Sequence, residues 1–303
     1  SPVDPISVFD IFKIGVGPSS SHTMGPMVAA GRFLDRLRSS PFQAAGLRAS
    51  LYGSLAFTGV GHATDRAVIL GLAGFLPDSY DGERAETVLA QIRATKTVSP
   101  PDLPPLRFDP EADLIFDYGP ALPGHANGMI LMATDAQGDV ILKETYFSIG
   151  GGFVVTEAEL SGAAGGPKGP PVRYPFESAE AMLAMARDSG LSIATMKRAN
   201  ELTRRDPAAL SAGIARIWAV MDACIERGLA TDGVLPGGLK VRRRAKGIHD
   251  ALIAERGLNL TAPHVINDWM SVYAMAVNEE NAAGGQVVTA PTNGAAGVVP
   301  AVI

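Results

Sequence analysis

The stretch TEAELSGAAGGPKGPPVRYP, residues 156–175, divides the chain into two halves of different character. Eight of its 20 residues are Gly or Pro, a composition that is typical of linkers between domains. Before this stretch, strand-like runs alternate with helical ones, whereas after it the pattern is helical throughout. We therefore predict an α+β domain over residues 1–155, a linker over 156–175 and an all-α domain over 176–303.

The first half of the chain shows both helix-like and strand-like patterns of apolar residues. Apolar residues recur at helical spacing over residues 27–37 and 62–75, which predicts two helices. Strands are predicted for four runs, the last two of which are joined by a turn at 135–138. These runs are residues 47–55, 113–118, 128–134 and 139–148.

The second half carries helix start and stop signals. Ser178 can cap a helix that Gly190 ends, and Ser192 can cap the next one. Asp206 followed by Pro207 predicts the start of a long helix that runs to Gly228. A further helix is predicted for residues 263–278.

Composition excludes several classes of protein. With 47% hydrophobic and 19% charged residues the chain is not disordered, and its net charge of −5 argues against binding nucleic acid. The one cysteine, Cys224, excludes an intrachain disulfide and fits a reducing cytoplasm. The N-terminus has no signal-peptide pattern, and the uncharged residues 281–303 contain too much Gly and Pro for a membrane span. We expect a cytoplasmic protein with no membrane partner.

The motif GVGPSSSHTMGP, residues 15–26, is the first candidate site. It places three serines, an imidazole and a threonine just ahead of a predicted helix, and these are Ser19, Ser20, Ser21, His22 and Thr23. The start of a helix offers free N–H groups that suit an anion such as a carboxylate. The alternative is that these residues only cap the helix and form turns.

Two glycine-rich motifs are further candidates. The first, TGVGHATD (58–65), contains His62, but Thr64 stands where a dinucleotide fingerprint needs its third glycine, so a nicotinamide enzyme is poorly supported. The second, YFSIGGGF (146–153), allows a backbone to approach a ligand closely. A pyridoxal-phosphate enzyme would also need a Schiff-base lysine, and no persuasive one is present. The alternatives are a structural histidine and a plain bulge or turn.

Two stretches near the end of the sequence are rich in small and neutral polar residues. They are NEENAAGG (278–285) and TAPTNGAAG (289–297). Amides and hydroxyls among small residues suit a compact pocket for a polar small molecule. The alternative is a pair of Asn/Gly turns.

These motifs together resemble one known family. SVFDIFKIGVGPSSSHTMGP (7–26), GH (61–62), SIGGG (148–152), GVLPG (233–237) and residues 278–294 are similar, in this order, to motifs of the bacterial iron–sulfur L-serine dehydratases. The resemblance implies an N-terminal domain like the allosteric substrate-binding domain of some phosphoglycerate dehydrogenases, followed by a helical catalytic domain. It also implies conversion of L-serine to pyruvate and ammonia without pyridoxal phosphate. A [4Fe–4S] cluster, held by three cysteines, would leave one iron open to act as a Lewis acid.

The resemblance also implies roles for individual residues. The catalytic candidates are His22, His62 and Ser148, of which either a histidine or Ser148 could be the base. The substrate-binding candidates are Ser19, Ser20, Ser21, Thr23, Gly150, Gly151, Thr292, Asn293 and Gly294. We expect L-serine as the substrate, a homodimer, and no nucleic-acid partner.

The sequence departs from the family pattern in its cysteines. The cluster ligands of the family follow the Thr-Asn-Gly segment, so we expect them beyond Ile303 and expect no metal ligand within this chain. The apolar end PAVI (300–303) favours a protein that continues. The chain alone is then expected to be inactive. The main alternative is a non-catalytic module that senses serine or another anion, and the second is a pyridoxal-phosphate lyase.

We predict that the 303-residue chain binds no iron–sulfur cluster, because it has one cysteine where the implied cluster needs three. After anaerobic reconstitution with iron and sulfide and removal of the excess, both elements should remain far below one cluster per chain. Stoichiometric iron and sulfide would contradict this prediction.

Overall fold

The computed structural model describes residues 5–60, 62–162, 169–256 and 265–303. A seven-stranded sheet forms the N-terminal half, in the order β3-β4-β2-β6-β7-β8 with β5 beside β2. The strands are β2 (Gly46–Leu51), β3 (Thr97–Val98), β4 (Leu106–Arg107), β5 (Leu114–Phe116), β6 (Gly128–Thr134), β7 (Val140–Gly150) and β8 (Phe153–Thr156). The pairs β2–β6, β6–β7 and β7–β8 are antiparallel, whereas β2 is parallel to β4 and β5.

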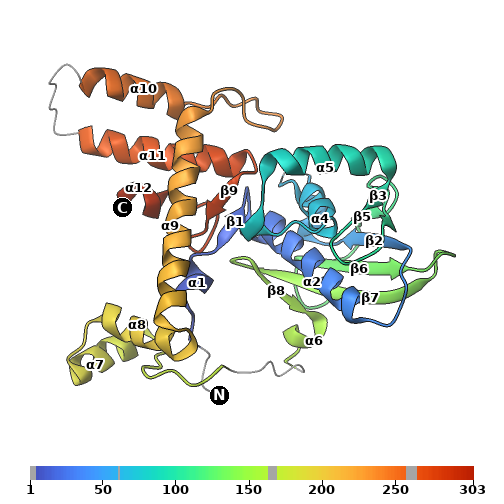
Figure 1. The fold of residues 1–303 in the computed structure, drawn as a ribbon, viewed down its shortest axis with the longest axis horizontal. Helices are drawn as coiled ribbons and strands as arrows, with labels where there is room; N and C mark the ends of the chain where they lie inside the picture. Colours follow the sequence, from blue (N-terminus) through green and yellow to red (C-terminus); the bar gives the residue numbers. More distant parts are fainter. Residues whose placement is uncertain (1–4, 61, 163–168, 257–264) are drawn as a thin grey trace.

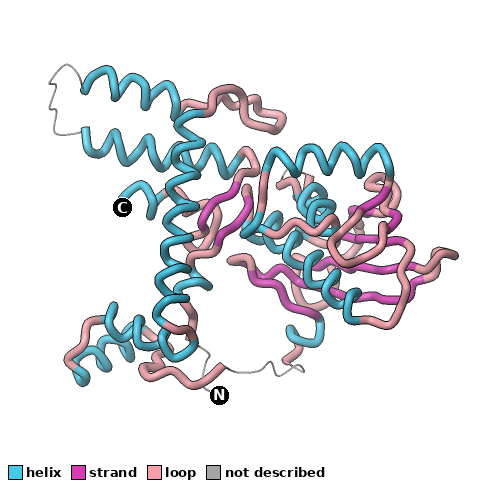
Figure 2. The backbone as a smooth tube through the Cα atoms, viewed as in Figure 1, coloured by secondary structure: helices cyan, strands magenta, loops and turns pink. Residues whose placement is uncertain are grey.

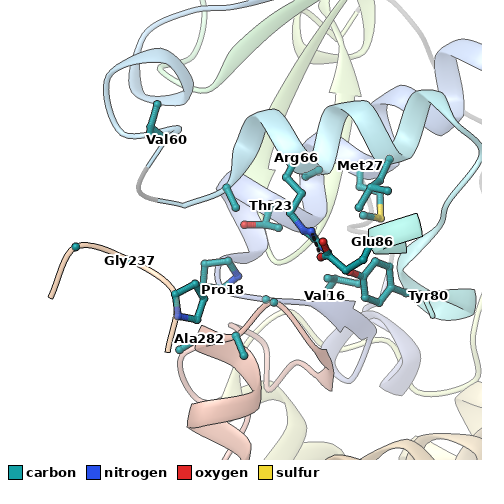
Figure 3. A pocket seen from close by; sticks show the side chains of 18 residues that line it. Val16, Pro18, Thr23, Met27, Val60, Arg66, Tyr80, Glu86, Gly237 and Ala282 are labelled. Carbon is teal, nitrogen blue, oxygen red and sulfur yellow. Dashed lines mark hydrogen bonds and ion pairs between the residues drawn. The ribbon is translucent and has the colours of Figure 1, made fainter. Parts of the chain in front are cut away.

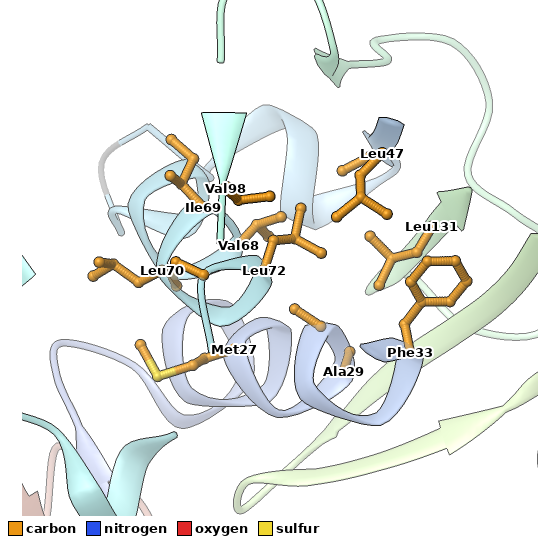
Figure 4. Packing of buried hydrophobic residues seen from close by; sticks show 14 of the residues in the cluster. Met27, Ala29, Phe33, Leu47, Val68, Ile69, Leu70, Leu72, Val98 and Leu131 are labelled. Carbon is orange, nitrogen blue, oxygen red and sulfur yellow. The ribbon is translucent and has the colours of Figure 1, made fainter. Parts of the chain in front are cut away.

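Three helices cover this sheet and close its core (Figure 1). They are α2 (Gly25–Ser39), α4 (Thr64–Leu72) and α5 (Gly82–Thr95). The core between the helices and the sheet is filled by fully buried apolar side chains, among them Phe33 of α2, Val68 of α4 and Leu131 of β6 (Figure 4). Each such side chain stabilises the fold by about 1.5–3 kcal/mol. The core therefore fixes α2 and α4, and these two helices carry the candidate site at their N-terminal ends.

The C-terminal half is built mainly of helices around the long α9. They are α7 (Ala179–Ser189), α8 (Ile193–Arg204), α9 (Pro207–Ala230), α10 (Ala245–Arg256), α11 (Val265–Ala282) and α12 (Val298–Val302). A second core joins α9, α10 and α11, and it contains Cys224, as expected for a small apolar side chain. Among the described residues, α9 is the helix long and apolar enough to cross a membrane, by length and composition alone. A single helix of this kind is weak evidence of a span.

Most predicted elements are confirmed. The strand predicted for 128–134 is β6, and Ser178, Ser192 and Asp206 cap α7, α8 and α9 with their side chains. The helix predicted for 263–278 is α11, although its first two residues lie outside the described part of the chain. Of the predicted linker, Thr156 ends β8 and caps the short helix α6 (Glu157–Leu160), and residues 163–168 lie outside the described part of the chain.

Two predictions were wrong in part. The strand predicted for 47–55 ends at Leu51, because Gly53 turns the chain with a φ of +55° and Ser54 begins the short helix α3 (Ser54–Phe57). The C-terminal half is not purely helical, since β9 (Gln286–Val288) pairs antiparallel with β1 (Ile14–Val16) from the other end of the chain. Figure 2 shows this small sheet between the large sheet and α9. A three-residue strand whose partner is some 270 residues away leaves little periodicity to detect.

The first helix, α1 (Val8–Ile11), lies on the helical half. The buried carboxylate of Glu201 on α8 accepts hydrogen bonds from the Val8 N–H (2.7 Å) and the Ser7 hydroxyl (3.0 Å). Arg205 binds the same carboxylate at 2.7 Å and stacks on Phe9. A negative charge at the start of a helix satisfies its free N–H groups. Glu201 thus anchors the segment that leads into β1.

We predict that Glu201→Ala lowers the free energy of unfolding by about 1.5–3 kcal/mol, because several hydrogen bonds to a buried charge are lost together. Urea unfolding of the purified chain measures this. Glu226→Ala, at an exposed position on α9, is the matched control and should change the value by less than about 0.5 kcal/mol. Equal effects of the two substitutions would contradict an anchoring role.

Candidate active site

The central element of the site is η1 (Ser20–Met24), a single turn of π-helix that runs directly into α2. Ser19 caps it by accepting a hydrogen bond from the His22 N–H at 3.2 Å. Two threonines tie η1 to the start of α4. The Thr23 hydroxyl donates to the carbonyl of His62 at 2.7 Å, and the Thr64 hydroxyl donates to the carbonyl of His22. These reciprocal bonds bring the two histidine-containing motifs together.

The imidazole rings of His22 and His62 face each other with centroids 4.9 Å apart. Both nitrogens of His22 are engaged, Nδ1 with the Ser21 hydroxyl and Nε2 with the Ser54 hydroxyl, each at 2.8 Å. Burial lowers the pKa of His22 and the nearby His62 lowers it further, while the Ser54 backbone opposes this. Within the described residues, the ring nitrogens of His62 have no hydrogen-bond partner. The pair therefore combines one fixed imidazole with one whose nitrogens are available.

Ser148 lies beneath η1 and is fully buried. Its hydroxyl donates to the carbonyl of Ser21 at 2.7 Å. Gly25, at the start of α2, makes this possible, because a Cβ there would lie 2.0 Å from the Ser148 oxygen. Ser148 thus contacts the backbone of η1, and its proton already has an acceptor.

The triple glycine forms a tight hairpin turn between β7 and β8. Gly150 pairs with Phe153, so Gly151 and Gly152 are the two turn residues, with φ of +62° and +76°. Positive φ at both central positions is the geometry of a type I′ turn, which glycine adopts without strain. A Cβ on Gly152 would also lie 2.7 Å from the end of the Met24 side chain. The turn therefore packs closely against η1.

The Thr-Asn-Gly loop supports the site from the C-terminal half. Asn293 is 1% exposed, and its amide donates to the carbonyl of Val16 (3.0 Å) and to Oδ1 of Asn281 (3.3 Å). Asn281 in turn donates to the carbonyl of Pro18 at 3.1 Å. Both amides thus hold the backbone that precedes Ser19. Oδ1 of Asn293 is buried without a hydrogen-bond partner, whereas Thr292 and Gly294 are exposed.

A cavity of about 410 Å³ lies beside η1, between the two halves of the chain (Figure 3). Thr23, Val60 and Arg66 line it from the N-terminal half, and Gly237 and Ala282 line it from the C-terminal half. Its size suits a small molecule. The two charged groups on its wall, Arg66 and Glu86, form an ion pair with each other.

The structure thus brings together His22, His62, Ser148 and the hydroxyls of residues 19–23, as well as the glycine turn. Asn293 bonds to the backbone ahead of this group and to Asn281, and neither of these hydrogen bonds goes to a member of the group itself. Sequence reasoning missed Ser54, Thr64, Asn281 and Arg66. Thr64 and Asn281 stand inside motifs that were singled out, but no pattern in the sequence shows that their side chains bond to the histidine and proline backbones.

The described residues contain no group of three or more His, Cys, Asp or Glu side chains that could hold a metal ion. Burial raises the pKa of the Cys224 thiol to about 12. Only a thiolate is a good ligand for iron, so Cys224 is poorly suited to that role.

Comparison with known proteins adds a second line of observation. Residues 7–159 match the family described as "Serine dehydratase beta chain", and residues 188–303 match the family described as "Serine dehydratase alpha chain". The chain is 47% identical over 300 residues to an L-serine dehydratase of Streptomyces coelicolor and 44% identical over 302 residues to one of Haemophilus influenzae. It is 45% identical over 300 residues to L-serine dehydratase TdcG of Escherichia coli. Each match covers 98% of this chain and 65% of the relative, so the chain spans about two thirds of the length of these relatives.

We predict that Asn293→Ala lowers the free energy of unfolding by about 1–3 kcal/mol, because the Val16 carbonyl and Asn281 Oδ1 lose a buried donor. Urea unfolding measures the change. Asn267→Ala, at an exposed position on α11, is the matched control and should stay within about 0.5 kcal/mol of the parent. If Asn293→Ala leaves stability unchanged, the amide does not support β1.

Proposed function

The chain belongs to the serine dehydratase family, and on that basis we propose that it provides the substrate-binding and proton-transfer part of an L-serine ammonia-lyase. The reaction converts L-serine to pyruvate and ammonia. The observation that carries the proposal is the facing pair His22 and His62, at the start of a helix and among neutral hydroxyls.

His62 is the base in this proposal. Its ring nitrogens are free among the described residues, whereas both nitrogens of His22 are engaged and the Ser148 proton is donated to a backbone carbonyl. A positioned imidazole is the usual proton acceptor at neutral pH. It takes the Cα proton of serine, the electron pair left on Cα forms the Cα–Cβ double bond, and hydroxide leaves Cβ. The aminoacrylate product then reacts with water to give pyruvate and ammonia.

The substrate carboxylate and ammonium are proposed to bind among neutral groups. Thr23 is supported by its place on the wall of the 410 Å³ cavity, and Asn293 by its unpaired Oδ1. The other predicted contacts with the substrate are part of the same proposal. They are Ser19, Ser20, Ser21, Gly150, Gly151, Thr292 and Gly294.

The iron–sulfur cluster implied by the family does not fit the side chains of this chain. A cluster held by three cysteines needs three thiolates, and residues 1–303 contain one cysteine, whose thiol is buried. We therefore propose that the thiolates come from polypeptide outside these 303 residues, and that the chain alone is inactive. We call the cluster-loaded protein the holoenzyme.

Further proposals concern the domain organisation, the oligomeric state and the cellular location of the protein. We propose that residues 1–155 form a domain of the allosteric substrate-binding type and that residues 176–303 belong to the catalytic domain, with a linker at 156–175. A cytoplasmic homodimer is part of the same proposal, and the single cysteine supports a reducing compartment.

The function is tested by assaying anaerobic holoenzyme for pyruvate with L-serine, D-serine and buffer alone. Pyruvate from L-serine only is the expected result. If L-serine binds in calorimetry but yields no pyruvate, the sensing module is the better assignment. If it neither binds nor reacts, both assignments fail.

We predict that His62→Ala in the holoenzyme lowers kcat by about 10²–10⁴-fold, the usual contribution of general acid–base catalysis. Its melting temperature should stay close to that of the parent, because no described residue bonds to the His62 ring. His249→Ala on α10, away from η1, is the matched control and should retain kcat. A His62→Ala variant with normal kcat and a lowered melting temperature would show that His62 is structural.

A further inference from the structure

We propose that Thr23 and Thr64 are positioning residues for His62, because they hold its backbone against η1 so that its ring faces His22. We call these two residues and their two hydrogen bonds the threonine pair. The meaning of the pair for catalysis rests on the proposed role of His62 as the base. Its effect on the position of the His62 ring can be measured without any activity.

The direction of both hydrogen bonds is fixed by the groups that make them. A backbone carbonyl can only accept a hydrogen bond, so each hydroxyl is the donor. Thr23 of η1 gives its proton to the carbonyl of His62, and Thr64 of α4 gives its proton to the carbonyl of His22. Each threonine therefore binds the backbone of the histidine that belongs to the other motif, and the two motifs are joined at two points.

Thr64 acts from inside the protein. It is 0% exposed, and it is not among the described residues that line the 410 Å³ cavity. It can therefore act on a substrate in that cavity only through other residues. The helix α4 begins without a side-chain cap, so the Thr64 hydroxyl is used between two elements rather than within its own helix.

The backbone around His62 is itself restrained. The His62 N–H donates to the Thr58 carbonyl at 3.2 Å, and the Thr64 N–H donates to the Gly59 carbonyl at 2.8 Å. Ala63 lies between His62 and Thr64 and has a φ of +54°, which residues other than glycine rarely adopt. Such a conformation persists only where the surrounding structure imposes it. The bonds of the threonine pair lie on both sides of Ala63 and contribute to that restraint.

The His62 ring depends on its backbone for its position. Among the described residues its nitrogens have no hydrogen-bond partner, whereas the His22 ring is held by two serine hydroxyls. A general base must lie within hydrogen-bond reach of the proton that it removes. A displacement of about 1 Å can lower the rate on the order of 10²-fold. The proposed reaction therefore needs a fixed separation between His62 and η1, and the threonine pair supplies it.

The first experiment measures the position of the ring by NMR of the 303-residue chain, with ¹³C-labelled histidine in a deuterated background. The parent should show a nuclear Overhauser effect between the two rings, assigned with His22→Gln. Thr64→Val and Thr23→Val keep the shape of the side chain but remove the hydroxyl, so each should abolish this signal while the amide spectrum stays that of a folded chain. Thr64→Ser keeps the hydroxyl and should retain the signal. Thr58→Val is the matched control and should also retain it, because the Thr58 hydroxyl bonds within its own turn, to the Ser54 carbonyl.

The second experiment measures turnover of L-serine by the holoenzyme. Thr64→Val should lower kcat by about 10- to 100-fold, the loss expected for a displaced base. It should leave KM close to that of the parent, because Thr64 does not line the cavity. Thr64→Ser should restore kcat. A threonine that only stabilises the fold would lower the melting temperature without lowering kcat.

The two experiments separate this inference from the proposed function. Loss of the ring–ring signal in the valine variants, with rescue by Thr64→Ser, supports the threonine pair. Retention of the signal in Thr64→Val, or its equal loss in Thr58→Val, overturns it. If one valine variant does not fold, the other decides. If the signal is lost in Thr64→Val but kcat stays normal, the threonine pair positions the ring and the proposed role of His62 as the base fails.

Discussion

The pairing of β1 with β9 is the contact on which the candidate site depends. Ile14 pairs with Val288 and Val16 with Gln286, so the first strand of the chain is held by one from the C-terminal half. The amide of Asn293 adds a hydrogen bond to the carbonyl of Val16, the last residue of β1, and the amide of Asn281 binds the carbonyl of Pro18, just beyond the end of the strand. Ser19 and η1 follow immediately. The position of His22 relative to the sheet is therefore set by residues that lie more than 250 positions further along the chain.

Close backbone packing is the second constraint, and it explains why glycine stands at two positions around η1. A Cβ on Gly17 would lie 2.0 Å from the Asn281 carbonyl, and one on Gly25 would lie 2.0 Å from the Ser148 oxygen. Backbone cannot move aside as a flexible side chain can, so Gly17 is the stricter requirement of the two. Both glycines stand inside the first candidate motif, and they serve here to let protein approach protein.

The sequence was sufficient to predict much of the fold, because the information lies within short segments. Helix caps and strand patterns are local signals. They correctly predicted the starts of α7, α8 and α9, at Ser178, Ser192 and Asp206, and the strand β6. The pairing of β1 with β9 could not be read this way, since three-residue strands carry no periodicity and their partner is remote. The same holds for the site. Motifs identified His22, His62 and Ser148, but Ser54 became part of it only because Gly53 turns the chain after β2 and directs α3 toward η1.

The site is built almost entirely of neutral groups, and this follows from where its charged neighbours are engaged. Arg66, on the wall of the cavity, forms an ion pair with Glu86 and a hydrogen bond with the Tyr80 hydroxyl. The negative charge of Glu86 therefore offsets the positive charge of Arg66. Glu280 is likewise held by Arg227 and Arg243. The electrostatic environment of His22 is then set by its own burial and by His62, in that order. A fixed carboxylate at this position would hold an imidazole protonated. Hydroxyls and amides orient the two rings without imposing a charge, which leaves the proton of the pair free to move when a substrate supplies one.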